Sequence, residues 1–248
     1  MDTFNNKPTS GFSWSSTAIS NVGRVRKHNE DSMLERPEIG LWAVADGMGG
    51  HAAGDVASQM IVASLKKVHE GVALNRYVND IEDRILEVNQ KLIDKANESA
   101  RKVTIGSTVV ILLTYGKYFL YIWAGDSRLY RLRDGQLRQM TTDHSQVEMY
   151  VERGLITREE AATHPHGNMI TRAVGATQDL YLDMDMQELQ KKDRFMLCSD
   201  GLTKHVPDLE IESILKQGTH EECCTKLINL TLERGAGDNV TTIVVDIE

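Results

Sequence analysis

Two very short connections between strand-like runs are the feature that most constrains how this chain can fold. Residues 107–124 are rich in Val, Ile, Leu, Tyr and Trp and are interrupted only by the Gly-Lys dipeptide at 116–117. Residues 129–140 form a second such pair around the Asp-Gly dipeptide at 134–135. A two-residue connection joins antiparallel neighbours, whereas parallel strands need a long crossover. The sequence therefore predicts antiparallel sheet.

Helical and strand-like patterns account for most of the remaining chain. Apolar residues recur on one helical face over residues 55–69 and 81–96, so each helix should cover a sheet. Residues 142–180 mix Gly, His, Pro and charged side chains with weak periodicity, which indicates an inserted, partly helical flap. Residues 1–13 are expected to be a flexible N-terminus, and residues 14–248 one domain. Further helices are expected at 207–216 and 221–232, and further strands at 14–19, 41–45, 195–198 and 240–247.

The composition narrows the class of protein. A hydrophobic share of 41% in 248 residues is ordinary for a chain that buries a core. The formal net charge of −8 argues against nucleic acid or an anionic membrane as a partner, since either would require a basic surface. No signal peptide or long apolar run is visible, and the three cysteines, two of them adjacent, show no disulfide framework. We therefore expect a cytoplasmic monomer without a membrane segment.

Five aspartates stand out by their context: Asp31, Asp46, Asp126, Asp200 and Asp238. Four of them lie where an apolar strand meets a Gly, Ser or Asn, which places each carboxylate at the edge of a sheet. Any single Asp-Gly is typical of a turn, and that interpretation is kept for residues 134–135. If several of these carboxylates converge, their mutual repulsion raises their pKa values or requires cations.

Oxygen ligands without a nearby Cys or His cluster favour hard ions, so Mg²⁺ or Mn²⁺ is expected rather than Zn²⁺. Two such ions can lower the pKa of a water that they share and neutralise charge during displacement at phosphorus, which indicates phosphoester hydrolysis. Arg26 offers a planar fork for two phosphate oxygens. His51, in a glycine-rich loop, is a candidate to protonate a leaving alkoxide. For both residues an ordinary surface position is the alternative.

Eight sequence blocks follow one another along residues 16–246. They are GRVRKHNED at 23–31, LWAVADGMGGHAAGDVAS at 41–58, GSTVV at 106–110, AGDSRLYRLRDG at 124–135, TTDHSQV at 141–147, NMITRAVG at 168–175, LCSDGL at 197–202 and GAGDNVTTIVV at 235–245. Together, and in this order, they resemble the metal-dependent protein phosphatases of the protein phosphatase 2C type in their bacterial form.

The resemblance implies an α+β fold of two stacked antiparallel sheets flanked by helices, an α-β-β-α sandwich with a flap subdomain. It implies a protein serine/threonine phosphatase that hydrolyses phosphoserine and phosphothreonine on proteins by a metal-activated water, with two or three Mg²⁺ or Mn²⁺ ions per chain. A cognate serine/threonine kinase or its targets would be the partners. Free-standing bacterial relatives often oppose such kinases, in some cases those that govern type VI secretion. At Gly167, many bacterial relatives carry a basic residue instead, which leaves flap contacts and substrate preference open.

The resemblance also assigns metal-binding roles. It implies that Asp46 bridges two ions, that Asp200 and Asp238 complete one of them, and that the Gly47 carbonyl serves the other. Asp126, together with Asp200, matches a third and weaker ion site of the family.

Roles around the ions follow from the same resemblance. Glu30 and Asp31 would act through metal-bound waters, and Arg26 would bind the phosphate of the substrate. His51 occupies the place of the family's proposed general acid. Asn239 would support the neighbouring aspartate.

Other classes of protein fit less well. Residues 47–52 formally match a dinucleotide-binding fingerprint, but residues 66–70 fall in a predicted helix where that fingerprint requires a second strand. A cysteine-nucleophile phosphatase would carry Arg six residues after the cysteine, and a P-loop motif is absent. The residues six positions after the three cysteines are instead Lys204, Asn229 and Leu230. A catalytically inactive phosphoprotein-binding module remains the alternative.

Overall fold

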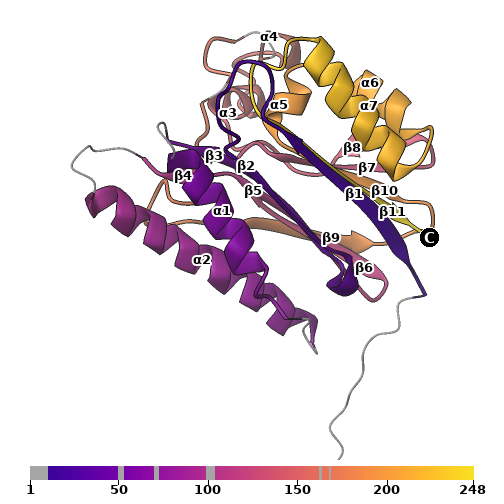
Figure 1. The fold of residues 1–248 in the computed structure, drawn as a ribbon, viewed down its shortest axis with the longest axis horizontal. Coiled ribbons are helices and arrows are strands. Elements are labelled where there is room, and N and C mark those ends of the chain that lie inside the picture. The colour runs from indigo at the N-terminus through magenta and orange to yellow at the C-terminus, as the bar shows by residue number, and fades with distance from the viewer. Residues whose placement is uncertain (1–10, 50–52, 70–72, 99–103, 162–163, 168) are drawn as a thin grey trace, which may run out of the picture.

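The computed structural model describes residues 11–49, 53–69, 73–98, 104–161, 164–167 and 169–248. In this part of the chain, two antiparallel sheets stack face to face and helices cover both outer faces (Figure 1). The predicted α+β fold with two stacked antiparallel sheets is therefore confirmed. Most of the expected N-terminal segment and His51 lie outside the described residues.

Each sheet has a simple order of strands. The first sheet contains β1 (Trp14–Asn21), β11 (Val240–Ile247), β10 (Arg194–Cys198), β7 (Arg128–Arg133) and β8 (Gln136–Gln139), in that order. The second contains β2 (Asp31–Arg36), β3 (Leu41–Met48), β5 (Val109–Tyr115), β6 (Tyr118–Ala124) and β9 (Asp183–Glu188), and the short β4 (Gly106–Ser107) pairs with β3. All of these pairs are antiparallel.

The helices form the outer layers of the sandwich. The second sheet is covered by α1 (Ala53–Leu65) and α2 (Leu74–Glu98), and the first by α6 (Asp208–Leu215) and α7 (His220–Glu233), as Figure 1 shows. The single-turn α5 (Asp200–Thr203) directly follows β10, and a 3₁₀ turn, η1 (Pro37–Ile39), joins β2 to β3. Among the helices of the described residues, none has both the length and the apolar character needed to cross a bilayer.

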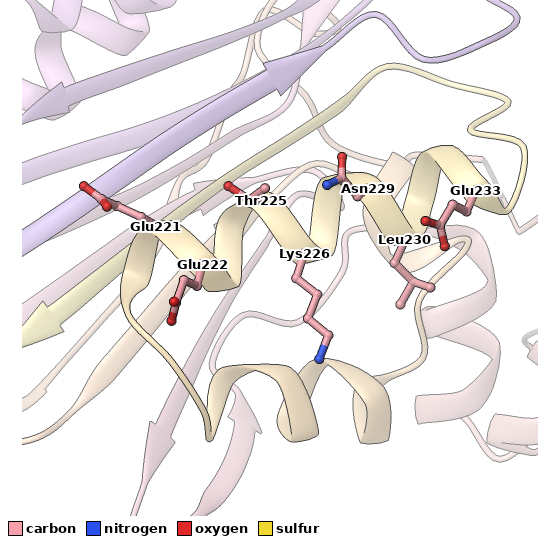
Figure 2. Close-up of a pocket in the computed structure, with 7 residues that line it drawn as sticks. All are labelled: Glu221, Glu222, Thr225, Lys226, Asn229, Leu230 and Glu233. Carbon is pink, nitrogen blue, oxygen red and sulfur yellow. The ribbon is translucent and has the colours of Figure 1, made fainter.

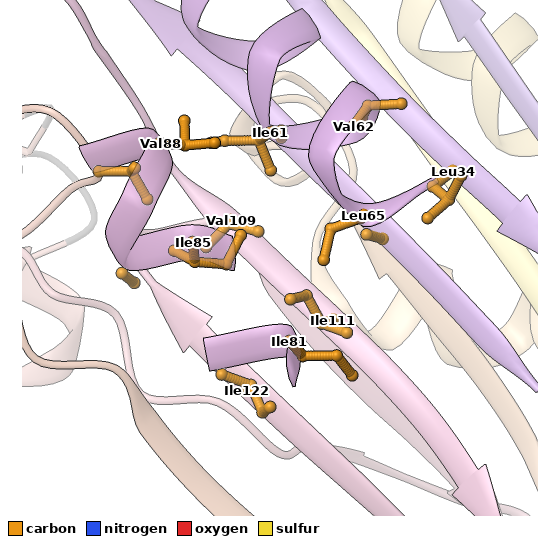
Figure 3. Packing of buried hydrophobic residues seen from close by; sticks show 14 of the residues in the cluster. Leu34, Ile61, Val62, Leu65, Ile81, Ile85, Val88, Val109, Ile111 and Ile122 are labelled. Carbon is orange, nitrogen blue, oxygen red and sulfur yellow. The ribbon is translucent and has the colours of Figure 1, made fainter. Parts of the chain in front are cut away.

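Strand β3 contributes to two cores at once. Leu41, Ala43 and Ala45 pack beneath α1 and α2, whereas Trp42 and Val44 pack between the two sheets. Successive side chains of a strand point to opposite faces, so a strand covered on both faces is apolar throughout. Figure 3 shows the helix-covered cluster, in which Ile, Leu and Val side chains of α1 and α2 face those of β5 and β6.

Both predicted hairpins are confirmed. The strands β5 and β6 are joined by residues 116–117, and β7 and β8 by residues 134–135. Asp134 and Gly135 have φ angles of +51° and +75°. Two consecutive residues with positive φ are what the favoured two-residue hairpin turn requires, so this Asp-Gly is a turn, as expected.

Two strands were not predicted. β2 and β9 have the sequences DSMLER and DMDMQE, and each lies at an edge of the second sheet. Edge strands tolerate charged side chains because one of their backbone edges has no neighbouring strand, so hydrophobic patterning does not reveal them. Two helix boundaries also differ from expectation by more than two residues. α1 ends at Leu65 instead of 69, and α2 begins at Leu74 instead of 81.

The segment between β8 and β9 contains the flap-like insertion. It holds two short helices, α3 (Gln146–Glu152) and α4 (Arg158–Ala161), which lie at one end of the sandwich in Figure 1. Isolated β-bridges join Ser145 to Ile170 and Ser107 to Val174, so the insertion is fastened to the core near β4. Its function as a flap stays a prediction.

Candidate metal centre

Asp31 and Asp46 stand opposite each other at the end of the second sheet. The antiparallel register of β2 and β3 pairs them directly. Because side chains alternate along a strand, Asp46 continues the row of Trp42 and Val44, which faces the space between the sheets. The Asp46 carboxylate thus lies where the inter-sheet core ends.

The first sheet brings two more aspartates to the same end. Asp200 is the first residue of α5, directly after β10, and Asp238 lies two residues before β11. β10 and β11 are hydrogen-bonded neighbours, so these two carboxylates are close in space. Asp126 follows β6 after Gly125, whose φ of +113° turns the chain sharply. The structure therefore brings together the five aspartates singled out in the sequence.

A pair of hydroxyls joins the two sheets at this point. Asp31 Oδ2 accepts a hydrogen bond of 2.8 Å from Ser199 Oγ and one of 2.7 Å from Thr241 Oγ1. Ser199 Oγ in turn accepts a hydrogen bond from the backbone N–H of Thr241. Sequence reasoning missed both hydroxyl residues, and the only available signal was their position inside the LCSDGL and GAGDNVTTIVV blocks.

The electrostatics of the cluster show uncompensated negative charge. Burial raises the pKa of Asp46 well above its usual range, and repulsion from the other four aspartates adds to that shift. Burial raises the pKa of Asp126 to about 7. It also raises the pKa of Asp31 to about 6, although the two hydroxyl hydrogen bonds oppose the change. A bound divalent cation would lower these pKa values, because it stabilises the charged carboxylates.

The donor atoms fit a hard cation. Asp31 Oδ1 and Asp126 Oδ1 are buried and have no hydrogen-bond partner among the described residues. The carboxylate oxygens are the type of ligand that Mg²⁺ and Mn²⁺ prefer. Within the described ranges, no three Asp, Glu, His or Cys side chains are arranged to enclose an ion as they stand. The oxygens of Asp200 and Asp238 instead face basic side chains.

Those basic side chains are Lys204 and Arg26. Lys204 Nζ lies 2.5 Å from Asp200 Oδ2 and 3.6 Å from Asp238 Oδ2. Arg26 places Nε 2.9 Å from Asp238 Oδ1 and donates from Nη2 to Asp238 Oδ2 at 3.1 Å. This hydrogen-bonded pair raises the pKa of Arg26. Half of the Arg26 side chain is exposed, so the guanidinium borders the cluster without being buried in it.

Asn239 holds the loop that carries Arg26 and Glu30. Its side-chain Nδ2 donates to the carbonyls of Val22 and His28, and its Oδ1 accepts from the backbone N–H of Glu30. The expected link to the adjacent aspartate is also present, because the Asn239 N–H donates to Asp238 Oδ1 at 3.0 Å. The predicted supporting residue thus has a larger structural role than the sequence indicated.

Close packing surrounds Glu30 and Gly47. The Gly47 N–H donates to the Glu30 carbonyl at 3.1 Å. A Cβ at Gly47 would lie 2.0 Å from the carbonyl oxygen of Gly54 in α1, so no side chain fits there. A Cβ at Gly54 would lie 2.9 Å from Glu30 Oε1, which places the Glu30 carboxylate against the start of α1.

Thr108 fixes the backbone of Asp46. Its hydroxyl accepts from the Asp46 N–H at 3.1 Å and lies 2.7 Å from Ser127 Oγ, next to Asp126. The Asp46 carbonyl accepts from the backbone N–H of Thr108 and from Ser107 Oγ. The GSTVV block therefore connects two of the aspartates, a role that the sequence analysis did not assign.

A cavity of about 540 Å³ opens beside Asp126 and Asp200. Gly167, the position where the sequence departs from many relatives, lines it together with Lys204 and residues of α3 and α4. A second hollow of about 570 Å³ lies on the outer face of α7 (Figure 2). None of the predicted site residues lines that hollow, so it plays no part in the candidate centre.

Comparison with known sequences places the chain in a family. A family model described as protein phosphatase 2C matches residues 24–240. The serine/threonine protein phosphatase PstP of Mycobacterium tuberculosis is 36% identical over 93% of this chain, which spans only 44% of that protein's length. The serine/threonine phosphatase stp of Listeria monocytogenes is 36% identical over 90% of this chain and 92% of its own length.

Solved structures agree with this assignment. PppA, described as a key regulatory component of T6SS in Pseudomonas aeruginosa, superposes with a TM-score of 0.88 and 40% identity, covering 95% of this chain and 98% of that one. The catalytic domain of PstP in complex with two manganese ions superposes with a TM-score of 0.85 and 35% identity, covering 95% of this chain and 99% of that one. The chain belongs to the protein phosphatase 2C family, whose members are metal-dependent, and its relatives PstP and stp are serine/threonine protein phosphatases.

Proposed function

We propose that this chain hydrolyses phosphoserine and phosphothreonine on proteins and that the aspartate cluster is its reaction centre. One observation carries the proposal: five aspartates from both sheets converge at one end of the sandwich, and two of their buried oxygens have no hydrogen-bond partner among the described residues. Such a cluster keeps its carboxylates charged at neutral pH only if cations are bound, because burial and mutual repulsion otherwise raise their pKa values. The family match and the relatives support phosphoprotein hydrolysis as the use of those cations.

The residues assigned to the ions are those expected from the resemblance. Asp46 would hold two ions, Asp200 and Asp238 would complete one of them, and the Gly47 carbonyl would serve the other. Asp126, with Asp200, would hold a third. Glu30 and Asp31 would act through water. The bound ions, Mg²⁺ or Mn²⁺, supply an activated water and neutralise charge on the phosphoryl group.

Other side chains bind, orient and move protons. Arg26 is half-exposed at the rim of the cluster and carries the planar fork suited to two phosphate oxygens. Binding phosphate through Nε and Nη2, the atoms that now contact Asp238, would exchange that carboxylate for the substrate. Asn239 keeps the Arg26 loop in place during this exchange. His51, outside the described residues, is proposed to donate a proton to the departing serine or threonine oxygen.

The natural substrates are proposed to be a cognate serine/threonine kinase or its targets. The likeness to PppA supports a bacterial signalling setting of the kind described for that protein. We further propose a monomer that works in the cytoplasm. The three cysteines, all buried and unpaired, agree with a reducing compartment.

Hydrolysis assays test this proposal. A phosphothreonine peptide and p-nitrophenyl phosphate are offered to the purified protein with EDTA, Mg²⁺ or Mn²⁺. We expect hydrolysis that requires Mn²⁺ or Mg²⁺ and is lost in Asp46→Asn. Asp134→Asn is the matched control, because this aspartate lies in a hairpin turn where Asn also accepts positive φ. A folded wild-type protein that binds the phosphopeptide but never hydrolyses it would instead support the phosphoprotein-binding alternative.

A further inference from the structure

Lys204 reaches into the aspartate cluster from the first sheet. It immediately follows the single-turn α5, and its backbone N–H donates to the Asp200 carbonyl at 2.9 Å. This turn places the Lys204 side chain on the same face as Asp200, four residues earlier. Its ammonium contacts Asp200 Oδ2 at 2.5 Å and lies 3.6 Å from Asp238 Oδ2.

The surroundings of this ammonium differ from those of an ordinary helical ion pair. Lys216 also pairs with an acid four residues earlier, at 2.5 Å from Glu212, but among the described residues it contacts only that one carboxylate. Lys204 instead lies between two carboxylates that come from different elements. It also lines the cavity beside Asp126, which has a buried oxygen without a partner in the described part of the chain.

An ammonium and a divalent cation on the same pair of carboxylates repel each other, so each weakens the binding of the other. The contacts that Lys204 can make therefore depend on whether Asp200 and Asp238 hold an ion. If these aspartates hold an ion, repulsion between that ion and the ammonium should weaken or break the contact of Lys204 with at least one of them. When the ion leaves, the tethered lysine is available to neutralise the charge again.

We propose that Lys204 is a built-in competitor of the divalent cation at Asp200 and Asp238. It lowers the affinity of this edge of the cluster for metal and stabilises the protein when metal is scarce. The chain thereby responds to the supply of Mn²⁺ or Mg²⁺. This inference rests on the proposed function, since it assumes that Asp200 and Asp238 are metal ligands.

Calorimetric titration with Mn²⁺ tests the inference on protein stripped with a chelator and then dialysed. The variants are Lys204→Met, which keeps the length of the side chain without its charge, and Lys204→Gln as a second neutral form. Lys216→Met is the matched control. We expect at least one Mn²⁺ site in both Lys204 variants to tighten by about tenfold, because a competing unit charge is removed at close range. The control should match the wild type.

Melting temperature supplies an independent measurement. In EDTA, both Lys204 variants should melt below the wild type, because the carboxylates lose a neutralising partner. In saturating Mn²⁺ this difference should vanish, since tighter ion binding stabilises the folded state. Unchanged Mn²⁺ affinity in both Lys204 variants, with Mn²⁺ binding intact in the wild type, would overturn the lysine inference alone. No Mn²⁺ binding by the wild type would overturn the proposed function as well.

Discussion

Ser199, at the end of β10, donates a hydrogen bond of 2.8 Å to Asp31, at the start of β2, and so connects the two sheets of the sandwich beside the aspartate cluster. Thr241 donates to the same carboxylate oxygen at 2.7 Å. These contacts explain how a negatively charged group is kept between the sheets. They also make the geometry of the candidate centre depend on residues far apart in the sequence.

Removing one of these hydroxyls should destabilise the fold. Thr241→Val keeps the shape of the side chain and leaves a buried carboxylate oxygen with one fewer donor, which we expect to cost about 1–3 kcal/mol of unfolding free energy. Urea denaturation in EDTA measures the change. Thr242→Val is the control, because the Thr242 hydroxyl is buried without any partner among the described residues. Equal losses in the two variants would contradict the importance of the cross-sheet bond.

Asn239 should matter for substrate binding through the loop that it holds, which carries Arg26. Asn239→Asp replaces the amide that donates to Val22 and His28 by a second acceptor, so the Arg26 loop should loosen. We expect a raised KM for a phosphothreonine peptide and a loss of about 1–3 kcal/mol in stability. Asn229→Asp, on the exposed face of α7 in Figure 2, is the control. A wild-type KM in Asn239→Asp would rule out this positioning role.

His144 should make the structure near Asp126 sensitive to acid. Its Nδ1 accepts from the Gly125 N–H at 3.1 Å, which requires an unprotonated nitrogen. Burial, followed by the charge of Arg172, lowers the pKa of His144, although Asp183 and Asp143 oppose the shift. A histidine whose folded pKa is lowered contributes stability that is fully present above its unfolded pKa, near 6.5, and is lost as the pH falls from there through the lower folded pKa.

Because the raised pKa values of Asp126 and Asp31 favour the folded state as the pH falls through the same range, the contribution of His144 is measured as a difference: from pH 7.5 to 5.5, the unfolding free energy of the wild type should fall relative to that of His144→Gln. Urea denaturation at several pH values measures both. His166→Gln, an exposed residue of the flap segment, should retain the wild-type dependence. If His144→Gln and the wild type lose the same free energy over this range, the assignment to His144 is wrong.

A basic residue at position 167 should change substrate preference. Gly167 lines the cavity next to Asp126 and Asp200, and a Cβ there would lie 3.2 Å from the nearest heavy atom, the His164 carbonyl oxygen. Gly167→Arg should lower the KM for phosphopeptides with acidic flanking residues by about twofold to fivefold, the range of exposed ion pairs. Hydrolysis of p-nitrophenyl phosphate, which has no flanking residues, should not change. Equal effects on both substrates would argue against a role in peptide preference.

The elements of the fold that are set by residues adjacent in the sequence could be predicted. The dipeptides at 116–117 and 134–135 set the hairpins, and the apolar run at 41–45 correctly marked a strand, which the structure shows to be buried on both faces. The charged edge strands β2 and β9 could not be recognised, because their side chains are partly solvated and follow no apolar pattern.

The candidate centre was predicted in part. Four of its five aspartates were found because each borders an apolar run, and the structure brings all five together. Ser199, Thr241 and Thr108 were missed, since their importance arises from contacts across the sandwich that no local pattern encodes. The pairing of Lys204 with Asp200 and Asp238 likewise required the positions of β10, α5 and β11. The assignment of His51 stays a prediction.

Anomalous diffraction at the manganese absorption edge, measured from crystals grown with Mn²⁺, tests the central claim most directly. The account predicts anomalous peaks within coordination distance of Asp46, Asp200 and Asp238, with the Lys204 ammonium displaced from at least one of the latter two. Asp46→Asn crystals should lose at least one of these peaks. Manganese bound elsewhere, or a wild-type structure without a peak at Asp46 in saturating Mn²⁺, would contradict the assignment of this cluster as the reaction centre.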